Sequence, residues 1–211
     1  MACMTAPSTT HADPPRPGLR ERKKIKTRGA IRAAAYALIE EQGYDATTIE
    51  QIADRAEVSP STVSRYFPAK EDIVVTDEWD PALAAELRSR PADEPWADSL
   101  RHVLRTALGP GLAEEPEVTR LRARLGVEVP AVRARMLQST AATGRLLRQA
   151  LAERSGLDPE GLELRVFAMA VMSGLTEVSH YWAETGHRHD IRDLVDRALV
   201  VLEHGLPTGK P

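Results

Sequence analysis

Aromatic residues and cysteine are scarce in this chain of 211 residues. Phe, Trp and Tyr together make up 4% of it, so any core or pocket has to rely on Leu, Ala, Val and Met. The single cysteine, Cys3, excludes an intrachain disulfide, which fits a reducing compartment. The sequence has no Gly-rich phosphate loop, and neither Ser155 nor Ser173 has the strand–turn–helix context of a nucleophile elbow. We therefore expect a protein that is not an enzyme.

Long hydrophobic runs are also lacking. The longest uncharged apolar stretch, residues 166–176, is well short of the roughly 20 residues that span a bilayer. Residues 1–18 are rich in Pro, Ser and Thr and have no apolar signal-peptide core, so we expect a disordered tail, no membrane partner and a cytoplasmic location. His187 and His189 lack a third convergent ligand, so we expect no metal site.

Charge is divided unevenly along the chain. Residues 1–70 hold 11 Lys and Arg against 8 Asp and Glu, whereas the remainder holds 17 against 23. Residues 16–32 alone contain eight basic residues and one acidic residue, Glu21. A basic N-terminal segment on an acidic protein indicates that this segment binds a polyanion. It could instead only increase solubility, and composition does not decide between the two interpretations.

The apolar pattern of the N-terminal third predicts short helices. Apolar residues recur at helical spacing from Ile31 to Ile39, and Gly43 would end this first helix. A second helix should follow the capping hydroxyl of Thr48. A third should start at residue 60, with Ser59 as its N-cap.

The rest of the chain also has a helical pattern. Pro68 would stop the third helix, and a fourth should run from Lys70 towards Asp80. Longer helices are expected near residues 82–88, 96–108, 117–125, 131–155, 158–184 and 191–204. No segment alternates like a strand, so the sequence predicts an all-α fold. We divide it into a tail (1–18), a three-helix N-terminal domain (19–68) and a helical C-terminal domain (69–211).

The third helix has a strongly polar surface. On a helical wheel that starts at Ser61, Arg65 lies about 40° away, Thr62 about 100° and Tyr66 about 140°. These side chains share one face. Short hydroxyl groups allow close approach to base edges, and an arginine can reach a guanine edge or a phosphate.

The opposite face of the third helix is apolar. Val63 and Phe67 are four residues apart and can pack against Ile49, Ile52 and Ala53 of the second helix. Two short helices joined by a tight turn, the second with one apolar and one hydrogen-bonding face, predict a helix-turn-helix that reads DNA.

Residues 43–74 read GYDATTIEQIADRAEVSPSTVSRYFPAKEDIV, and the segment from about Leu19 to Val75 closely resembles the DNA-binding domain of TetR-family transcriptional regulators. The shared order is a Gly-aromatic helix end, a Thr-Thr cap, an Ile-Ala pair, Val-Ser, a hydroxyl-rich helix, Tyr-Phe and Lys-Glu-Asp. Glu57 replaces a glycine that the family commonly has at positive φ, and Ser64 replaces an aromatic that touches DNA in many members. Our candidate DNA-contacting residues are Lys26, Thr48, Ser59, Ser61, Thr62, Ser64, Arg65, Tyr66 and Lys70.

The C-terminal helices offer a dimer surface and a pocket, as the resemblance implies. An apolar stripe on the last helix is the candidate dimer interface: Ile191, Leu194, Val195, Ala198, Leu199 and Leu202. The alternative is that this stripe closes the core of one protomer. The candidate pocket residues are aromatic, Met, His and Leu side chains of the middle helices: Trp96, His102, Leu121, Met136, Phe167, Met169, Met172, His180, Tyr181 and Trp182. Few aromatics favour an apolar, flexible effector, such as an acyl chain.

The sequence therefore predicts a DNA-binding transcriptional regulator, a ligand-responsive repressor that binds a palindromic double-stranded DNA operator as a homodimer. No cofactor is expected besides an unidentified small-molecule effector. Two alternatives stay open. One is a regulator without an effector, or an activator. The other is a helical ligand-binding protein or enzyme with a vestigial DNA-binding domain.

Overall fold

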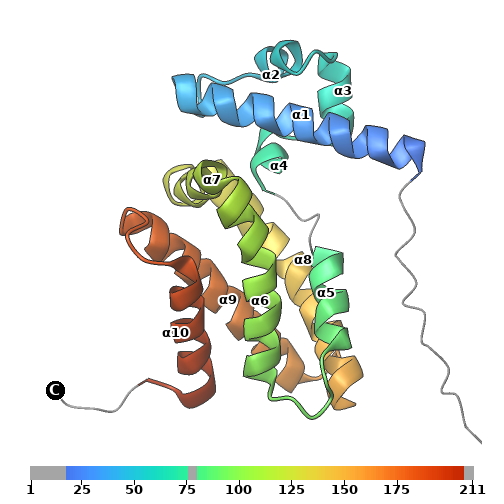
Figure 1. Ribbon diagram of the computed structural model, residues 1–211, viewed down its shortest axis with the longest axis vertical. Coiled ribbons are helices and arrows are strands. Elements are labelled where there is room, and N and C mark those ends of the chain that lie inside the picture. Colours follow the sequence, from blue (N-terminus) through green and yellow to red (C-terminus); the bar gives the residue numbers. More distant parts are fainter. Residues whose placement is uncertain (1–17, 76–79, 207–211) are drawn as a thin grey trace, which may run out of the picture.

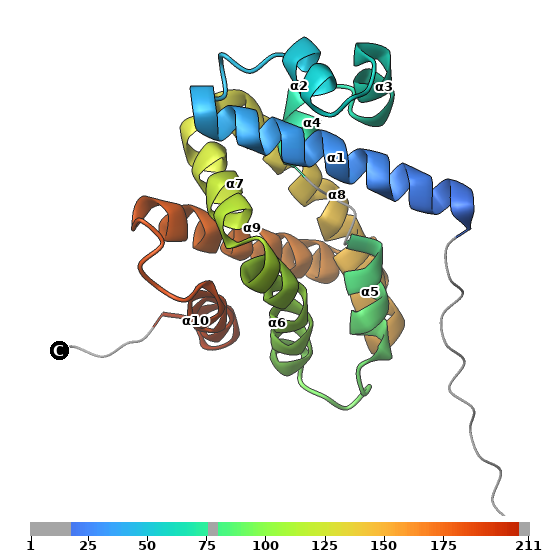
Figure 2. The ribbon, with the colours of Figure 1, turned by 45° about the horizontal axis from the view of Figure 1, so that its top comes forward.

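The computed structural model describes residues 18–75 and 80–206, and in both ranges the regular structure is entirely helical (Figure 1). The N-terminal part consists of α1 (Leu19–Gln42), α2 (Ile49–Arg55), α3 (Pro60–Tyr66) and α4 (Lys70–Val74). Helices α2 and α3 lie on the side of α1 that faces away from the rest of the protein (Figures 1 and 2). Of the predicted tail (1–18), residues 1–17 lie outside the described residues.

Six further helices form the C-terminal part. They are α5 (Asp80–Ser89), α6 (Trp96–Glu114), α7 (Pro116–Glu128), α8 (Pro130–Ser155), α9 (Leu162–Glu184) and α10 (Ile191–His204). Helix α9 packs against α7, α8 and α10, and α5 and α6 cover the remaining side of α8 and α10. The predicted all-α fold, with an N-terminal helix-turn-helix and a C-terminal helical domain, is confirmed.

The predicted ends of the first helices are confirmed by their capping geometry. Gly43 ends α1 at φ +86°, a backbone angle that favours glycine. The Thr48 hydroxyl accepts from the Gln51 amide, and the Gln51 side chain accepts in return from the Thr48 amide, which makes a capping box at the start of α2. The Ser59 hydroxyl caps α3 by accepting from the Thr62 amide.

Three predicted helix boundaries are wrong. Helix α4 does not run towards Asp80, because Val75 is extended (φ −83°, ψ 124°) and ends it. Helix α6 continues past residue 108 because Leu108 and Leu112, one turn apart, both pack against the C-terminal core. Helix α9 begins at residue 162 rather than 158, because the Asp158 carboxylate accepts from the Glu160 amide and closes a turn there.

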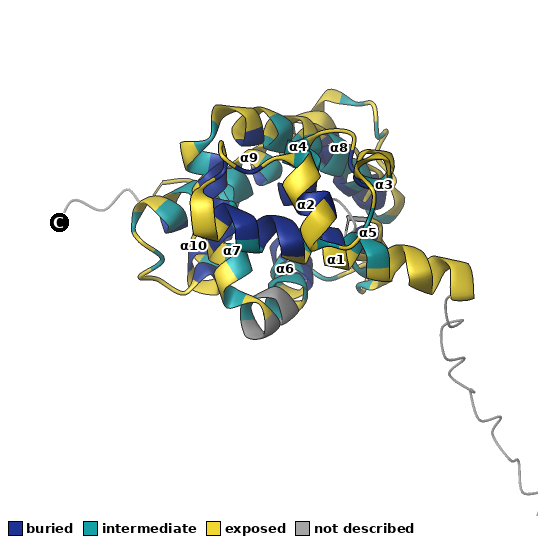
Figure 3. Cartoon of the chain, turned by 90° about the horizontal axis from the view of Figure 1, so that it is seen from above, coloured by how far each residue is buried: buried dark blue, intermediate teal, exposed yellow. Residues whose placement is uncertain are grey.

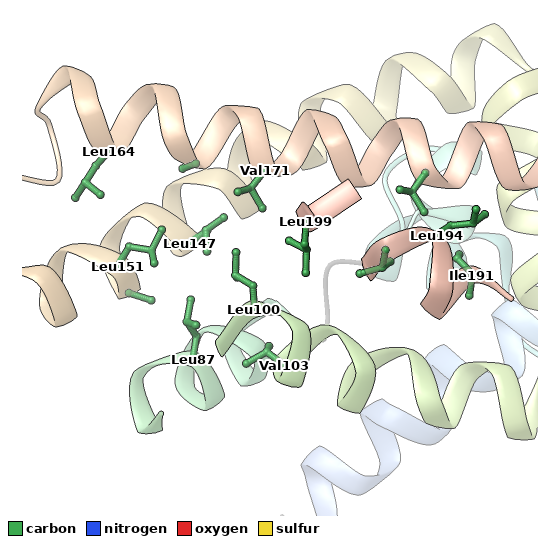
Figure 4. Close-up of a cluster of buried hydrophobic side chains, with 14 of the residues drawn as sticks. Leu87, Leu100, Val103, Leu147, Leu151, Leu164, Val171, Ile191, Leu194 and Leu199 are labelled. Carbon is green, nitrogen blue, oxygen red and sulfur yellow. The ribbon is translucent and has the colours of Figure 1, made fainter. Parts of the chain in front are cut away.

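Each of the two parts has its own apolar core. The N-terminal core joins α1, α2, α3 and α4 around fully buried Ile31, Ile52 and Ile73. The C-terminal core is larger and joins α5, α6, α7, α8, α9 and α10. In Figure 4, Leu100 of α6 points towards Leu147 of α8 and Val171 of α9, and Leu199 of α10 belongs to the same cluster. Leu and Val dominate this core, as the low aromatic content predicted.

A third apolar cluster connects the two parts through α4. It packs Tyr36 of α1 and Val74 of α4 against Leu121 of α7 and Val132 of α8. Polar contacts reinforce it. The Arg122 guanidinium on α7 donates to the Val74 carbonyl at 2.9 Å, and Arg135 on α8 pairs with Asp72. Helix α4 therefore packs between α1 on one side and α7 and α8 on the other.

Candidate DNA-binding surface and effector cavities

Helix α3 is anchored as its sequence predicts. Val63 and Phe67 are almost completely buried and pack with Ile52 and Ala53 of α2, while Ile49 lies at the edge of the same cluster. This burial fixes the rotation of α3 about its own axis. The hydrogen-bonding residues between the anchors therefore face outwards.

The start of α3 carries a cluster of hydroxyl groups. The Ser59 Oγ lies 2.9 Å from both the Ser61 Oγ and the Thr62 Oγ1, so the Ser59 hydroxyl hydrogen-bonds to both of the other side chains. Ser59 and Ser61 are exposed and Thr62 is half-buried. Each hydroxyl has both donor and acceptor capacity, which suits either a base edge or a phosphate oxygen.

The last turn of α3 presents a cation beside an aromatic ring. Ser64 and Arg65 are exposed, and the Arg65 guanidinium carbon lies 5.5 Å from the centre of the Tyr66 ring. Tyr66 is half-buried, and its carbonyl accepts from Arg28 of α1 at 3.4 Å. Stacking restricts the Arg65 side chain to the outer face of α3, where a guanidinium can reach a guanine edge.

The turn between α2 and α3 has the backbone that the TetR resemblance implies. Glu57 adopts φ +54°, a left-handed conformation that costs a non-glycine residue roughly 1 kcal/mol. Its amide donates to Asp54, and the next amide, of Val58, donates to Ala53. These bonds hold the tight turn without a glycine, and α2 and α3 keep their packing.

Lys70 has a structural position that the sequence did not reveal. Its Nζ donates to the carbonyls of Tyr44 and Thr47, at 2.8 and 2.9 Å, and lies 4.0 Å from the centre of the Tyr44 ring. The ammonium thus joins the start of α4 to the turn before α2. Thr48, the next residue in that turn, is exposed beside it. Contact of Lys70 with a phosphate stays a prediction.

The first two turns of α1 are exposed on all sides. Every residue from Leu19 to Lys26 is exposed, and Figure 2 shows this end of α1 extending beyond α2 and α3. Viewed from above, the same end is a continuous exposed surface (Figure 3). It carries most of the basic run, including Lys26, and DNA contact by Lys26 also stays a prediction.

Two cavities lie between the C-terminal helices. The larger, about 430 Å³, is formed by the end of α8 and the starts of α6 and α9, at the end of the domain remote from α3 (Figure 1). Trp96 and Phe167, both predicted pocket residues, line it with their rings edge to face at 4.6 Å. The smaller cavity, about 180 Å³, lies between α5, α6, α8 and α9 and is lined by Met172, another predicted residue. Its lining is aliphatic except for Met172 and Thr143.

The other predicted pocket residues are dispersed. Leu121 and Met136 belong to the cluster around α4, away from the two cavities. Trp182 is buried in the C-terminal core, where its Nε1 donates to the His189 carbonyl. Neither of the two cavities brings these side chains together with Trp96.

Four predicted pocket residues lie towards the surface. Met169 and Tyr181 are exposed on α9, with Tyr181 stacked on His189, and His180 is half-buried. His102 is exposed beside Glu86. The sequence pattern did not indicate the charged rim of the larger cavity, because Glu94 in the α5–α6 loop and Arg154 at the end of α8 are far apart in the sequence.

Glu94 is held strongly ionised at this rim. Hydrogen bonds from Arg90, and secondarily from Ser99, lower the pKa of the Glu94 carboxyl to about 2. Arg154 donates to the carbonyls of Leu87, Arg90 and Pro91, so its guanidinium fixes the α5–α6 loop. Charged side chains that are held by hydrogen bonds therefore surround the opening of this cavity, and its interior is apolar.

The predicted dimer stripe on α10 mostly faces the protomer's own core, which corrects the prediction. Ile191, Leu194, Val195 and Leu199 are buried against α6 and α9, and Ala198 and Leu202 pack at the edge of the same core. The helical spacing identified an apolar face but not its partner. Other apolar residues of the last two helices are exposed: Val166, Met169, Tyr181, Val200 and Val201.

No helix in the described parts of the chain combines the length and apolarity needed to cross a membrane. Within residues 18–75 and 80–206, no three His, Cys, Asp or Glu side chains converge as metal ligands would.

The chain is similar to known transcriptional regulators along most of its length. A family model described as bacterial regulatory proteins of the tetR family matches residues 31–75, and one described as the MftR C-terminal domain matches residues 94–207. The HTH-type transcriptional regulator TcmR of Streptomyces glaucescens is 34% identical over 183 residues, which cover 82% of this chain and 80% of TcmR.

Solved structures share the fold. The FadR regulator of Bacillus subtilis, in complex with stearoyl-CoA, aligns with a TM-score of 0.60 at 20% identity over 85% of this chain and 99% of that one. FadR of Thermus thermophilus, a TetR-family repressor in complex with lauroyl-CoA, aligns with a TM-score of 0.57 at 24% identity, over 87% and 97%. With the helix-turn-helix geometry and the matched family models, these findings show that the chain belongs to the TetR family of DNA-binding transcriptional regulators.

Proposed function

We propose that this protein is a ligand-responsive repressor that binds a palindromic operator as a homodimer. The observation that carries the proposal is the orientation of α3. Its apolar anchors, Val63 and Phe67, are buried, and its hydroxyl and guanidinium groups form a continuous outer face. A recognition helix of this kind fits the major groove.

Dimerisation follows from the energetics of reading DNA. One short recognition helix makes few base contacts, so specific affinity requires two half-sites held by a two-fold dimer. The exposed apolar residues of α9 and α10 support a self-complementary interface there. Val166 on α9 and Val200 and Val201 on α10 are each more than 40% exposed. Burying such a surface against a second copy would stabilise the pair.

The cavities support an apolar effector. Aliphatic side chains line the smaller cavity, and Leu151, Leu164 and Phe167 line much of the larger one. The FadR structures similar to this chain hold acyl-CoA molecules. We therefore propose an effector with an apolar chain. Its binding would shift α8, which carries Arg135, and thereby α4 and α3. By linkage, operator DNA must weaken effector binding by the same factor.

Operator binding is tested by fluorescence anisotropy with a labelled duplex from the promoter region beside the protein's own gene. A random duplex of equal length, at roughly physiological salt, is the reference. We expect binding to the promoter fragment to be at least a hundredfold tighter than to the random duplex. Equal affinity for the two duplexes would contradict the proposal.

Dimerisation is tested by sedimentation of Val201→Glu, which places a charge in the proposed interface. We expect monomers, with operator affinity greatly reduced. Leu137→Glu, at a similarly exposed leucine of α8, is the matched control and should remain dimeric. A dimer that survives Val201→Glu with wild-type operator affinity would contradict this interface.

The effector response is tested by adding fatty acids and acyl-CoAs of increasing chain length to the operator complex. We expect one class to release the DNA. Met172→Trp, which fills the smaller cavity, should abolish that response without changing operator affinity. Release that persists unchanged in Met172→Trp would place the effector elsewhere.

A further inference from the structure

A basic groove lies between α8 and α9, separate from the two cavities between the helices. Its volume is about 320 Å³, and three arginines line it: Arg145 and Arg148 from α8 and Arg165 from α9. Glu160, just before α9, is the acidic residue of the lining. Three cations against one carboxylate leave the groove with a net charge of about +2, on a part of the chain that is acidic overall.

The guanidinium groups of this groove are incompletely paired. Arg148 donates one Nη2 hydrogen bond to Glu160 at 2.6 Å, but its Nε is buried and has no hydrogen-bond partner among the described residues. Arg165 lies 3.8 Å from the other oxygen of Glu160. A guanidinium has five N–H donors, so most of those of Arg148 and Arg165 remain available to an additional acceptor in the groove.

The floor of the groove is apolar. It is formed by Ala141, Gly144, Ala168 and Met169. A Cβ at residue 144 would approach the Met169 sulfur to 3.3 Å, so the glycine gives room for the methionine to lie against α8. Met169 is 43% exposed and offers a polarisable surface beside the arginines.

We propose that this groove binds a small organic phosphate. A phosphate monoester carries a charge of about −1.5 to −2 at neutral pH, which matches the net charge of the groove. Its oxygens accept from the guanidinium forks of Arg145, Arg148 and Arg165. The organic part of the ligand lies on Met169 and the small residues beside it. The proposal depends on neither operator binding nor the apolar cavities.

The test is isothermal titration of the full chain with adenosine monophosphate, with inorganic phosphate and adenosine as references. We expect adenosine monophosphate to bind with micromolar affinity, inorganic phosphate at least tenfold more weakly, and adenosine not at all. Binding should weaken below about pH 6, where the phosphate loses its second charge. Absence of binding by either phosphate at millimolar concentration overturns the proposal, and equal affinity for the two overturns the role of the apolar floor.

Two substitutions separate a ligand site from a structural cluster. Arg145→Gln changes an exposed residue and should weaken phosphate binding about tenfold without changing the melting temperature. Glu160→Gln removes the competing carboxylate and should tighten phosphate binding severalfold. Arg124→Gln, on the exposed face of α7, is the matched control and should change neither quantity. Weaker binding in Glu160→Gln, or a wild-type affinity in Arg145→Gln, contradicts the proposal.

The second copy of the chain offers another source of carboxylates for these arginines. Sedimentation of Arg145→Gln distinguishes this case. We expect it to have the wild-type oligomeric state. Dissociation of the variant, together with no phosphate binding by the wild-type protein, assigns the groove to a subunit contact and overturns the proposal.

Discussion

Lys70→Ala should both destabilise the protein and reduce the salt dependence of its DNA binding. The substitution removes two hydrogen bonds from the ammonium to the carbonyls of Tyr44 and Thr47. Hydrogen bonds of a charged group contribute about 1.5–3 kcal/mol each in favourable cases. Lys70 is half-buried, so we expect a total loss of about 2–3 kcal/mol in the free energy of unfolding. For a chain of this size, that loss lowers the melting temperature by roughly 4–12 °C.

The salt dependence follows from the position of the same charge beside Thr48. If the remaining N–H of Lys70 contacts a phosphate, the slope of log K against log salt falls by about one unit, and binding weakens alike for all sequences. Calorimetry and anisotropy titrations at several salt concentrations measure the two effects separately. Lys26→Ala, at an exposed position, is the control and should leave the melting temperature unchanged. A Lys70→Ala protein that melts like the wild type would falsify the structural role, and an unchanged slope refutes the phosphate contact.

Three further predictions concern the recognition of bases, the stability of the fold and the dependence of that stability on pH. Thr62→Ala should change base preference more than overall affinity, which a selection from random duplexes can measure; equal losses on cognate and random DNA would contradict its reading role. Val63→Ala should lower the free energy of unfolding by about 2 kcal/mol in urea titrations, because it removes fully buried methyl groups, and a loss below about 0.5 kcal/mol contradicts the anchoring role. Arg90 lowers the pKa of Glu94 from 4.5 to about 2, so the stabilisation from this ionised carboxylate is present above pH 4.5 and lost as pH falls towards 2. The melting temperatures of wild type and Glu94→Gln should therefore converge in that window, and a constant difference would contradict this.

The helix-turn-helix could be predicted closely because its signals are local. The capping residues Thr48 and Ser59 and the anchors Val63 and Phe67 act within one or two turns of chain, and all four have the predicted roles. Even the strained turn at Glu57 was indicated by a position where the family has glycine. Such features depend on backbone geometry and helical periodicity, which a sequence encodes directly.

The C-terminal part was predicted less well because its signals are ambiguous. An apolar stripe shows that a face is covered, but not by which helix. The α10 stripe, with Leu199 at its centre, packs within the protomer. Trp96 and Phe167 meet in one cavity, whereas Leu121 packs beside α4 and Met169 lies in the surface groove. Residues so far apart in the sequence are brought together only by the order in which helices pack.

The sequence by itself determined that this protein is helical and that one short helix has a polar face suited to DNA, because capping, periodicity and the polarity of a helix face are properties of a few neighbouring residues. Only the tertiary structure decided where α4 ends, that Lys70 turns inwards to two carbonyls, and that Arg145, Arg148 and Arg165 share one groove. These features depend on which faces of distant helices meet, and that choice is made by the packing of the whole core.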